Sequence, residues 1–267
     1  LIQDNKQAKL TLLNGYLLSV PDKFKAIEKA YRQRAKSKRF YDYHQANALY
    51  DDLTRNIAQP LEKIAGILPE QVECLSVQIM LEFERFSEMA DTSSGNWMDY
   101  YSTVLGAWIQ SLVAQKSSDP ALIAQKIFDF VANELYFGTE IFKTYRTLLG
   151  ADVLRPLRDM YYQKQHLREA LDISILIRDM DFLSAAFKRG AFCRPEHYFD
   201  YARLLMDEVR PGEAIELLLY MDKQGDKQHS DKTIWDELFI TALIEDGKSH
   251  EAMEKSMAAF SFRCDTR

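Results

Sequence analysis

Residues that interrupt helices are scarce in this sequence, which has 10 glycines and 7 prolines among 267 residues. Sandwiches and barrels need frequent turns, which these two residues usually supply. No stretch shows sustained alternation of apolar and polar side chains, so we predict no strand. The shortage of turn residues therefore favours long helices.

Cysteine is also rare. Cys74, Cys193 and Cys264 are far apart, and no Cys-x-x-Cys pair occurs. This pattern argues against a disulfide framework and a zinc ribbon, and it predicts a cytoplasmic protein. No apolar run approaches the roughly 18–20 residues that cross a bilayer, so we expect no membrane span. The chain opens at Leu1 without an initiator Met or a signal-peptide pattern, so we expect a piece of a longer protein.

Sequence motifs for catalysis and metal binding are missing as well. The five histidines are scattered and form neither an HExxH motif nor an i, i+4 pair. There is no glycine-rich phosphate loop, nucleophile elbow or Ser/Cys–His arrangement. Glu84 and Glu88 are one turn apart and could share a cation, but a solvated helix edge is the better explanation of them. We predict no catalytic residue, no metal and no cofactor, and a binding protein rather than an enzyme.

The first half, residues 1–149, is predicted to be an irregular lobe of long helices. Its apolar residues recur at helical spacing, and Pro60 should kink or split one of the helices. Asp91–Asn96 is rich in polar and turn-forming residues and predicts a loop. The expected helices cover residues 4–18, 21–37, 43 onward, 69–90, 97–112, 120–131 and 139–149.

The second half, residues 150–267, carries an internal repeat. A Glu-Ala pair occurs at residues 169–170, 213–214 and 251–252, with spacings of 44 and 38 residues that suit helical-hairpin repeats. The small alanine lets two helices approach closely, and the glutamate faces the positive end of the helix dipole. We therefore predict an all-α fold, an α-solenoid of antiparallel helix pairs that is tetratricopeptide-like in the second half.

Three stretches carry a resemblance to known proteins: residues 27–43, residues 201–205 followed by 212–215, and residues 250–264. On these stretches the chain resembles an uncharacterised bacterial family of helical-repeat proteins, a domain of unknown function related to helical segments found after SWIM-type zinc fingers. The resemblance implies a fold and no activity. The loop at residues 90–95 has fewer carboxylates than the family's acidic loop, and the family pattern continues beyond Arg267.

Basic residues concentrate between Lys23 and Arg39. This stretch contains eight lysines and arginines and one acidic residue, Glu28. Such a surface can hold nucleic acid or another polyanion. Alternatively, it is a solvated face whose charges pair with acids of the neighbouring helix, such as Asp51 and Asp52. The candidate polyanion- or partner-binding residues are Lys25, Lys29, Arg32, Arg34, Lys36 and Arg39.

Four tyrosines are candidate binding anchors. Tyr41, Tyr43, Tyr161 and Tyr162 are expected to be partly exposed at a concave groove, where aromatic side chains bind partners well. Because stacked helices present extended surfaces for protein recognition, the leading prediction is a scaffold that binds another protein. The alternative is nucleic-acid or other polyanion binding through residues 23–39.

Overall fold

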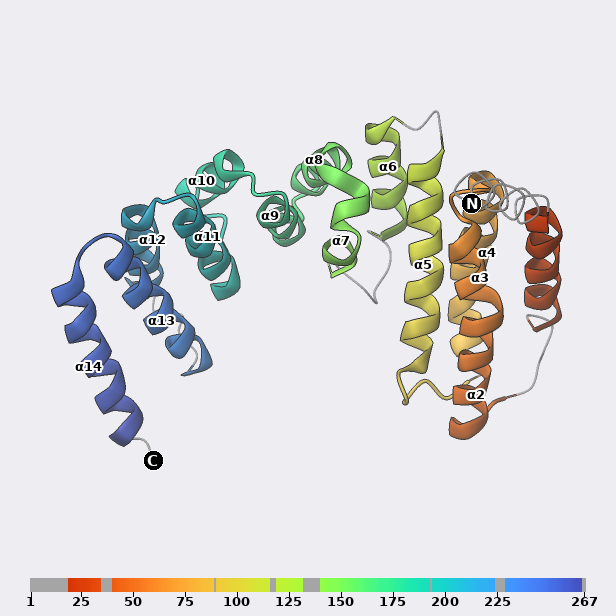
Figure 1. Cartoon of the computed structure of the whole chain (residues 1–267), viewed down its shortest axis with the longest axis horizontal. Coiled ribbons are helices and arrows are strands. Elements are labelled where there is room, and N and C mark those ends of the chain that lie inside the picture. The colour runs from red at the N-terminus through yellow and green to blue at the C-terminus, as the bar shows by residue number, and fades with distance from the viewer. Residues whose placement is uncertain are drawn as a thin grey trace, which may run out of the picture. The chain divides into compact units, whose positions relative to one another are not determined.

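The structure is a computed structural model that describes residues 19–34, 40–88, 90–115, 119–131, 140–192, 194–223 and 229–265. Within these ranges every regular element is a helix (Figure 1). Tyr41 and Ala90 form an isolated bridge. The prediction of an all-α fold is confirmed. The expected helix at residues 4–18 lies outside the described part. Among the described helices, none is both long and apolar enough to cross a membrane.

The chain divides into two compact units. The first comprises Leu1–Ile123 with Thr147–Leu149, and the second comprises Ala124–Arg146 with Gly150–Arg267. The chain first passes from one unit to the other within helix α6, Pro120–Val131, and the short stretch Thr147–Leu149 groups with the first unit.

Helices of the first unit pack around an aromatic core. Phe83 lies at its centre, with its ring 4.8 Å from that of Tyr101 and 5.6 Å from that of Trp97. The helix that carries Phe83 packs along the helix that carries the other two rings. The described helices are residues 19–34, α2 (Tyr43–Leu53), α3 (Gln59–Ile64), α4 (Pro69–Ser87) and α5 (Asn96–Ala114).

Pro60 interrupts the α-helical register, as predicted. Proline has no N–H to donate, and its ring clashes with the carbonyl four residues earlier. The chain passes this point through a π-helix, Thr54–Ala58, in which the Gln59 N–H bonds to the Thr54 carbonyl. The break at Pro60 is thus confirmed, and it takes the form of a wider turn between α2 and α3.

The second unit is a succession of helices, several of which are joined by tight turns within the described residues. Neighbouring helices pack in chain order from α11 to α14, and Trp235 ties two of them together by donating to the Leu218 carbonyl at 2.9 Å. The helices are α7 (Glu140–Thr144), α8 (Arg146–Gln163, bent at Gly150), α9 (Leu167–Leu176), α10 (Met180–Lys188), α11 (Pro195–Asp207), α12 (Pro211–Lys223), α13 (His229–Glu245) and α14 (Ser249–Asp265).

One turn geometry recurs in the described residues of this unit. At five helix ends a residue has positive φ. The N–H of the next residue donates to the carbonyl five residues before that next residue, at 2.8–3.0 Å. The residue with positive φ also bonds to the carbonyl three residues earlier, which completes a Schellman motif. The residues with positive φ are Gln165, Arg178, Gly190, Val209 and Gly247.

The three Glu-Ala pairs occupy equivalent positions in this arrangement. Each lies in the first turn of a helix that follows one of these turns, α9, α12 or α14. Ala170 and Ala214 are fully buried, and Ala252 nearly so. The burial of each alanine therefore agrees with the prediction that two helices approach closely there.

Candidate functional site

The basic helix of residues 19–34 holds the described members of the predicted cationic set. Lys25 and Lys29 are exposed, and neither forms an ion pair with a carboxylate in the described part of the chain. Arg32 bonds to Glu28 of the same helix at 2.6 Å. Lys36 and Arg39 lie outside the described residues. Within the described residues, two lysines of the predicted basic face therefore have no acidic partner.

Arg34 behaves differently, because it pairs with an acid of the neighbouring helix. Its Nε donates to Oδ2 of Asp52 in α2 at 2.7 Å, and its Nη2 makes a second, shorter contact with the same oxygen. Asp51 instead accepts a hydrogen bond from Asn96. The alternative of neutralisation by α2 therefore holds for Arg34, through Asp52.

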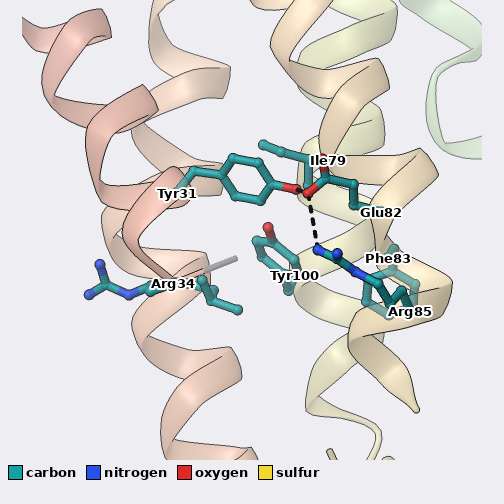
Figure 2. Close-up of a pocket in the computed structure, with 8 residues that line it drawn as sticks. Tyr31, Arg34, Ile79, Glu82, Phe83, Arg85 and Tyr100 are labelled. Carbon is teal, nitrogen blue, oxygen red and sulfur yellow. Dashed lines mark hydrogen bonds and ion pairs between the residues drawn. The ribbon is translucent and has the colours of Figure 1, made fainter. Parts of the chain in front are cut away.

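A second contact anchors the same helix to α4. The hydroxyl of Tyr31 donates to Oε2 of Glu82 at 2.6 Å, and Gln78 donates to the other carboxylate oxygen at 3.2 Å. Arg85 Nη2 lies 3.8 Å from Glu82 Oε2. Figure 2 shows Tyr31 and Glu82 pointing toward each other across the two helices, with Arg85 beside the carboxylate.

The cavity around this contact is too small for an organic substrate. Its volume is about 20 Å³, which is room for about one water molecule. Leu53, Ile79, Phe83 and Tyr100 supply its apolar walls. Figure 2 labels the last three of these residues. The site therefore has the dimensions of a packing defect between helices.

The titration behaviour of the pair also argues against proton transfer. Burial, reinforced by the bond to Glu82, raises the pKa of the Tyr31 phenol above its usual range. The hydrogen bond from Tyr31 is the largest cause that lowers the pKa of Glu82. Near neutral pH the phenol stays protonated and the carboxylate ionised, whereas a general acid or base needs a pKa near the working pH. We interpret the pair as an anchor for the basic helix.

The four predicted groove tyrosines are in different environments. Tyr43 is 45% exposed at the start of α2, and Tyr41 is half-buried on the bridge to Ala90. Tyr162 is half-buried, and its hydroxyl accepts a hydrogen bond from Arg189 at 2.9 Å. Tyr41 and Tyr43 belong to the first unit, and Tyr161 and Tyr162 to the second.

The expectation of partial exposure is wrong for Tyr161. Only 3% of this residue is exposed, and its ring meets those of Phe128 at 4.9 Å and Phe142 at 6.2 Å. The reason is helical spacing, because Tyr161 lies four residues after Leu157 and shares its buried face. Tyr161 is a core residue, and burial raises the pKa of its phenol.

Three partly exposed aromatic residues that the sequence did not single out come together on α10, α11 and α12. The rings of Tyr198 and Tyr220 stack at 6.4 Å, and Phe187 meets Tyr220 edge-on at 5.1 Å. Tyr220 is 39% exposed, and its neighbour Leu219 is also exposed. We call Phe187, Tyr198 and Tyr220 the aromatic patch. The sequence did not predict this patch, because Tyr198 lies on the apolar stripe of α11 and such a position is typical of a core residue.

A buried histidine and an aspartate form a polar contact in the second unit. His197 is buried, and its Nε2 lies 3.1 Å from Oδ1 of Asp172. Among the side chains that the structure describes, no three His, Cys, Asp or Glu residues gather as a metal-binding group. His197 and Asp172 thus link α11 to α9.

Comparison with known proteins adds no relative: no protein-family model, curated protein or solved structure matches this chain. The resemblance to the helical-repeat family therefore stays a prediction.

Proposed function

We propose that the second unit is a tetratricopeptide-like α-solenoid that binds another protein through the aromatic patch. The observation that carries the proposal is the stacking of Tyr198 on Tyr220 at a partly exposed position, with Phe187 against its edge. Aromatic side chains are enriched at protein interfaces, and tyrosine is a frequent hot-spot residue. The patch is therefore suited to hold apolar side chains of a partner.

The recurring turn supports the repeat part of the proposal. Helical-hairpin repeats need a fixed reversal and a close helix contact in each unit. The Schellman turns at Gln165, Val209 and Gly247 supply the reversal, and the buried alanines that follow allow the contact. Because the turns and alanines recur together, we favour a repeat over an unrelated set of helices.

A pair of matched tyrosine variants tests the binding role. Tyr220→Ser removes a patch residue that is 39% exposed, and Tyr43→Ser removes a tyrosine of similar exposure, 45%, in the first unit. We expect the tagged full chain to capture a defined protein from cell extract, and Tyr220→Ser to lower its recovery about tenfold. Tyr43→Ser should retain the partner. Equal recovery with all three proteins would refute the role of the patch.

A second candidate function is polyanion binding by the basic helix, and the pairing pattern of its lysines favours it. Lys25 and Lys29 are one turn apart and keep their charge available, whereas Arg32 and Arg34 are paired with Glu28 and Asp52. A protein that neutralises phosphates with lysines binds more weakly as the salt concentration rises, and the steepness of this decline grows with the number of phosphates neutralised. Removing the two lysines should therefore flatten the salt dependence.

Charge-reversal variants test this second function with a labelled single-stranded oligonucleotide at several salt concentrations. We expect Lys25→Glu with Lys29→Glu to abolish the salt-dependent binding. Lys188→Glu with Lys223→Glu makes the same charge change at positions of the second unit and serves as the control. No binding by the wild-type chain at low salt, or equal losses in both pairs, would eliminate this function.

We also propose a cytoplasmic location and a relationship to the helical segments that follow SWIM-type zinc fingers. The exposed free thiol of Cys74 supports a reducing compartment. The motifs at residues 201–205 and 212–215, which fall on α11 and α12, support the relationship.

A further inference from the structure

The end of helix α10 presents an arginine that is held in place by a tyrosine. Arg189 directly follows α10 and is exposed, and its Nη1 donates to the hydroxyl of Tyr162 in α8 at 2.9 Å. Phe182 of α10 meets the Tyr162 ring edge-on, with ring centres 5.3 Å apart, so the tyrosine is itself held by packing. These contacts restrict the guanidinium, which lowers the entropy lost when it binds a ligand.

The positive charge of Arg189 has no acidic partner in the described part of the chain. Asp159 in α8 and Asp179 before α10 both bond to Arg158. Asp181 lies at the opposite end of α10 from Arg189. Since the tyrosine hydroxyl is a neutral acceptor that takes one N–H, the other N–H groups of the guanidinium can bind a second acceptor.

Arg189 lies next to the aromatic patch. It follows Phe187 by two residues, so their Cα atoms are at most about 8 Å apart. Residues two positions apart point to different sides of a helix, and accordingly Phe187 contacts Tyr220 whereas Arg189 contacts Tyr162. A ligand that covers the end of α10 can therefore place one side chain on the aromatic rings and another on the guanidinium.

We propose that the partner of the aromatic patch carries an acidic residue whose carboxylate binds Arg189, close to the apolar residue that binds the patch. This inference rests on the proposed binding role of the patch. Arginine pairs with a carboxylate through two parallel hydrogen bonds, and bonds between charged partners are the strongest of this type. An extended peptide advances about 3.3 Å per residue, so the acid lies within about four residues of the apolar anchor.

An acid on α12 sets the direction of the partner. Glu216 is exposed one turn before Tyr220, on the same side of α12. A carboxylate of the partner placed beside Glu216 would be repelled, and such like-charge contacts oppose binding. The partner's acid therefore lies on the α10 side of the patch, and its apolar anchor lies on the α12 side.

Selection from a phage library of random heptapeptides tests this chemistry on the full chain. We expect the wild type to select peptides with an aromatic residue or leucine and with Asp or Glu within about four positions of it. Arg189→Gln should keep the apolar preference and lose the acidic one. Arg146→Gln is the matched control, because Arg146 is exposed without a described ion pair, at the other end of α8 from Tyr162. This variant should select the same peptides as wild type.

A synthetic copy of one selected peptide then measures the contact. Replacing its acid with the matching amide should weaken binding to the wild type about tenfold. The same replacement should change binding to Arg189→Gln by less than about twofold. Tyr162 is a positioning residue, so Tyr162→Phe should weaken binding of the acidic peptide about threefold and leave binding of the amide peptide unchanged. A general loss of folding would weaken both peptides.

The outcomes separate the two proposals. No apolar preference in the wild type, or the same preference in Tyr220→Ser, overturns the binding role of the patch and this inference with it. An apolar preference without an acidic one, or an acidic preference that persists in Arg189→Gln, overturns this inference alone. Equal effects of Arg189→Gln and Arg146→Gln also overturn it. Should Arg189→Gln lose its helical circular dichroism, Tyr162→Phe decides the question, and unchanged binding of the acidic peptide to that variant overturns the inference.

Discussion

The hydroxyl of Tyr31 donates a 2.6 Å hydrogen bond to Glu82, a residue 51 positions further along the chain. With the pair between Arg34 and Asp52, it fixes the basic helix against two other helices, α4 and α2. Lys25 and Lys29 then remain on the exposed side. These two polar contacts therefore orient the charged surface that the sequence predicted.

Replacing Tyr31 with phenylalanine tests this anchor. A hydrogen bond to a charged group contributes about 1.5–3 kcal/mol, but Glu82 is 35% exposed, so we expect a loss of only about 1 kcal/mol in the free energy of unfolding at pH 7. Tyr43→Phe, which removes an exposed hydroxyl, should change the free energy by less than about 0.5 kcal/mol. Urea denaturation followed by circular dichroism measures both.

The same variant has a pH signature. Since the native pKa of Glu82 is lowered, the stabilisation is complete above the pKa of the unfolded chain, about 4.3, and is lost as the pH falls through the native value. The difference between wild type and Tyr31→Phe should therefore shrink below about pH 4. A difference that stays constant on acidification would show that Tyr31 acts through packing alone.

Replacing Val209 with glycine and Gly247 with valine tests whether the two turns share one geometry. Val209 has φ of 58° and is 86% exposed, so its strain is not offset by packing. Val209→Gly should raise the free energy of unfolding by about 0.5–1 kcal/mol. Gly247 has φ of 78°, and a Cβ there would meet no atom within 4 Å. Gly247→Val should therefore lower stability, by about 1–3 kcal/mol, through backbone strain alone. If both variants shift stability in the same direction, the two turns are not equivalent.

Two alanines of α14 test the close helix contact in the repeat. Ala252 is buried, whereas Ala258 of the same helix is exposed. Overpacking by Ala252→Leu should cost about 1–3 kcal/mol of unfolding free energy. Ala258→Leu should cost less than about 0.5 kcal/mol. Equal thermal shifts for the two variants would mean that α14 does not pack through the face carrying Ala252.

Local signals in the sequence predicted most of the helices. Pro60, Pro69 and Pro120 marked a break and two helix starts, because the missing N–H restricts where proline fits. The Glu-Ala pairs marked the helices that follow the repeated turns. The turns at Gln165 and Arg178 were not predicted, since neither residue is the glycine that normally occupies positive φ.

Properties that depend on distant residues were harder to predict. The basic residues were visible in the sequence, but only the fold decides that Arg34 is paired while Lys25 and Lys29 have no acidic partner among the described residues. For Tyr161, the spacing from Leu157 indicates the buried face of the helix, but Phe128 and Phe142, whose rings pack against it, come from other helices. The aromatic patch likewise combines side chains of separate helices, so no local pattern could reveal it.

Site-specific photo-crosslinking tests the central claim, recognition of a protein by the aromatic patch, most directly. The photoreactive residue p-benzoylphenylalanine would replace Tyr220 in one version of the full chain and Tyr43 in another. We predict a crosslink from position 220 to one defined protein in cells and none to that protein from position 43. Crosslinks to the same proteins from both positions, or none from position 220, would contradict the account.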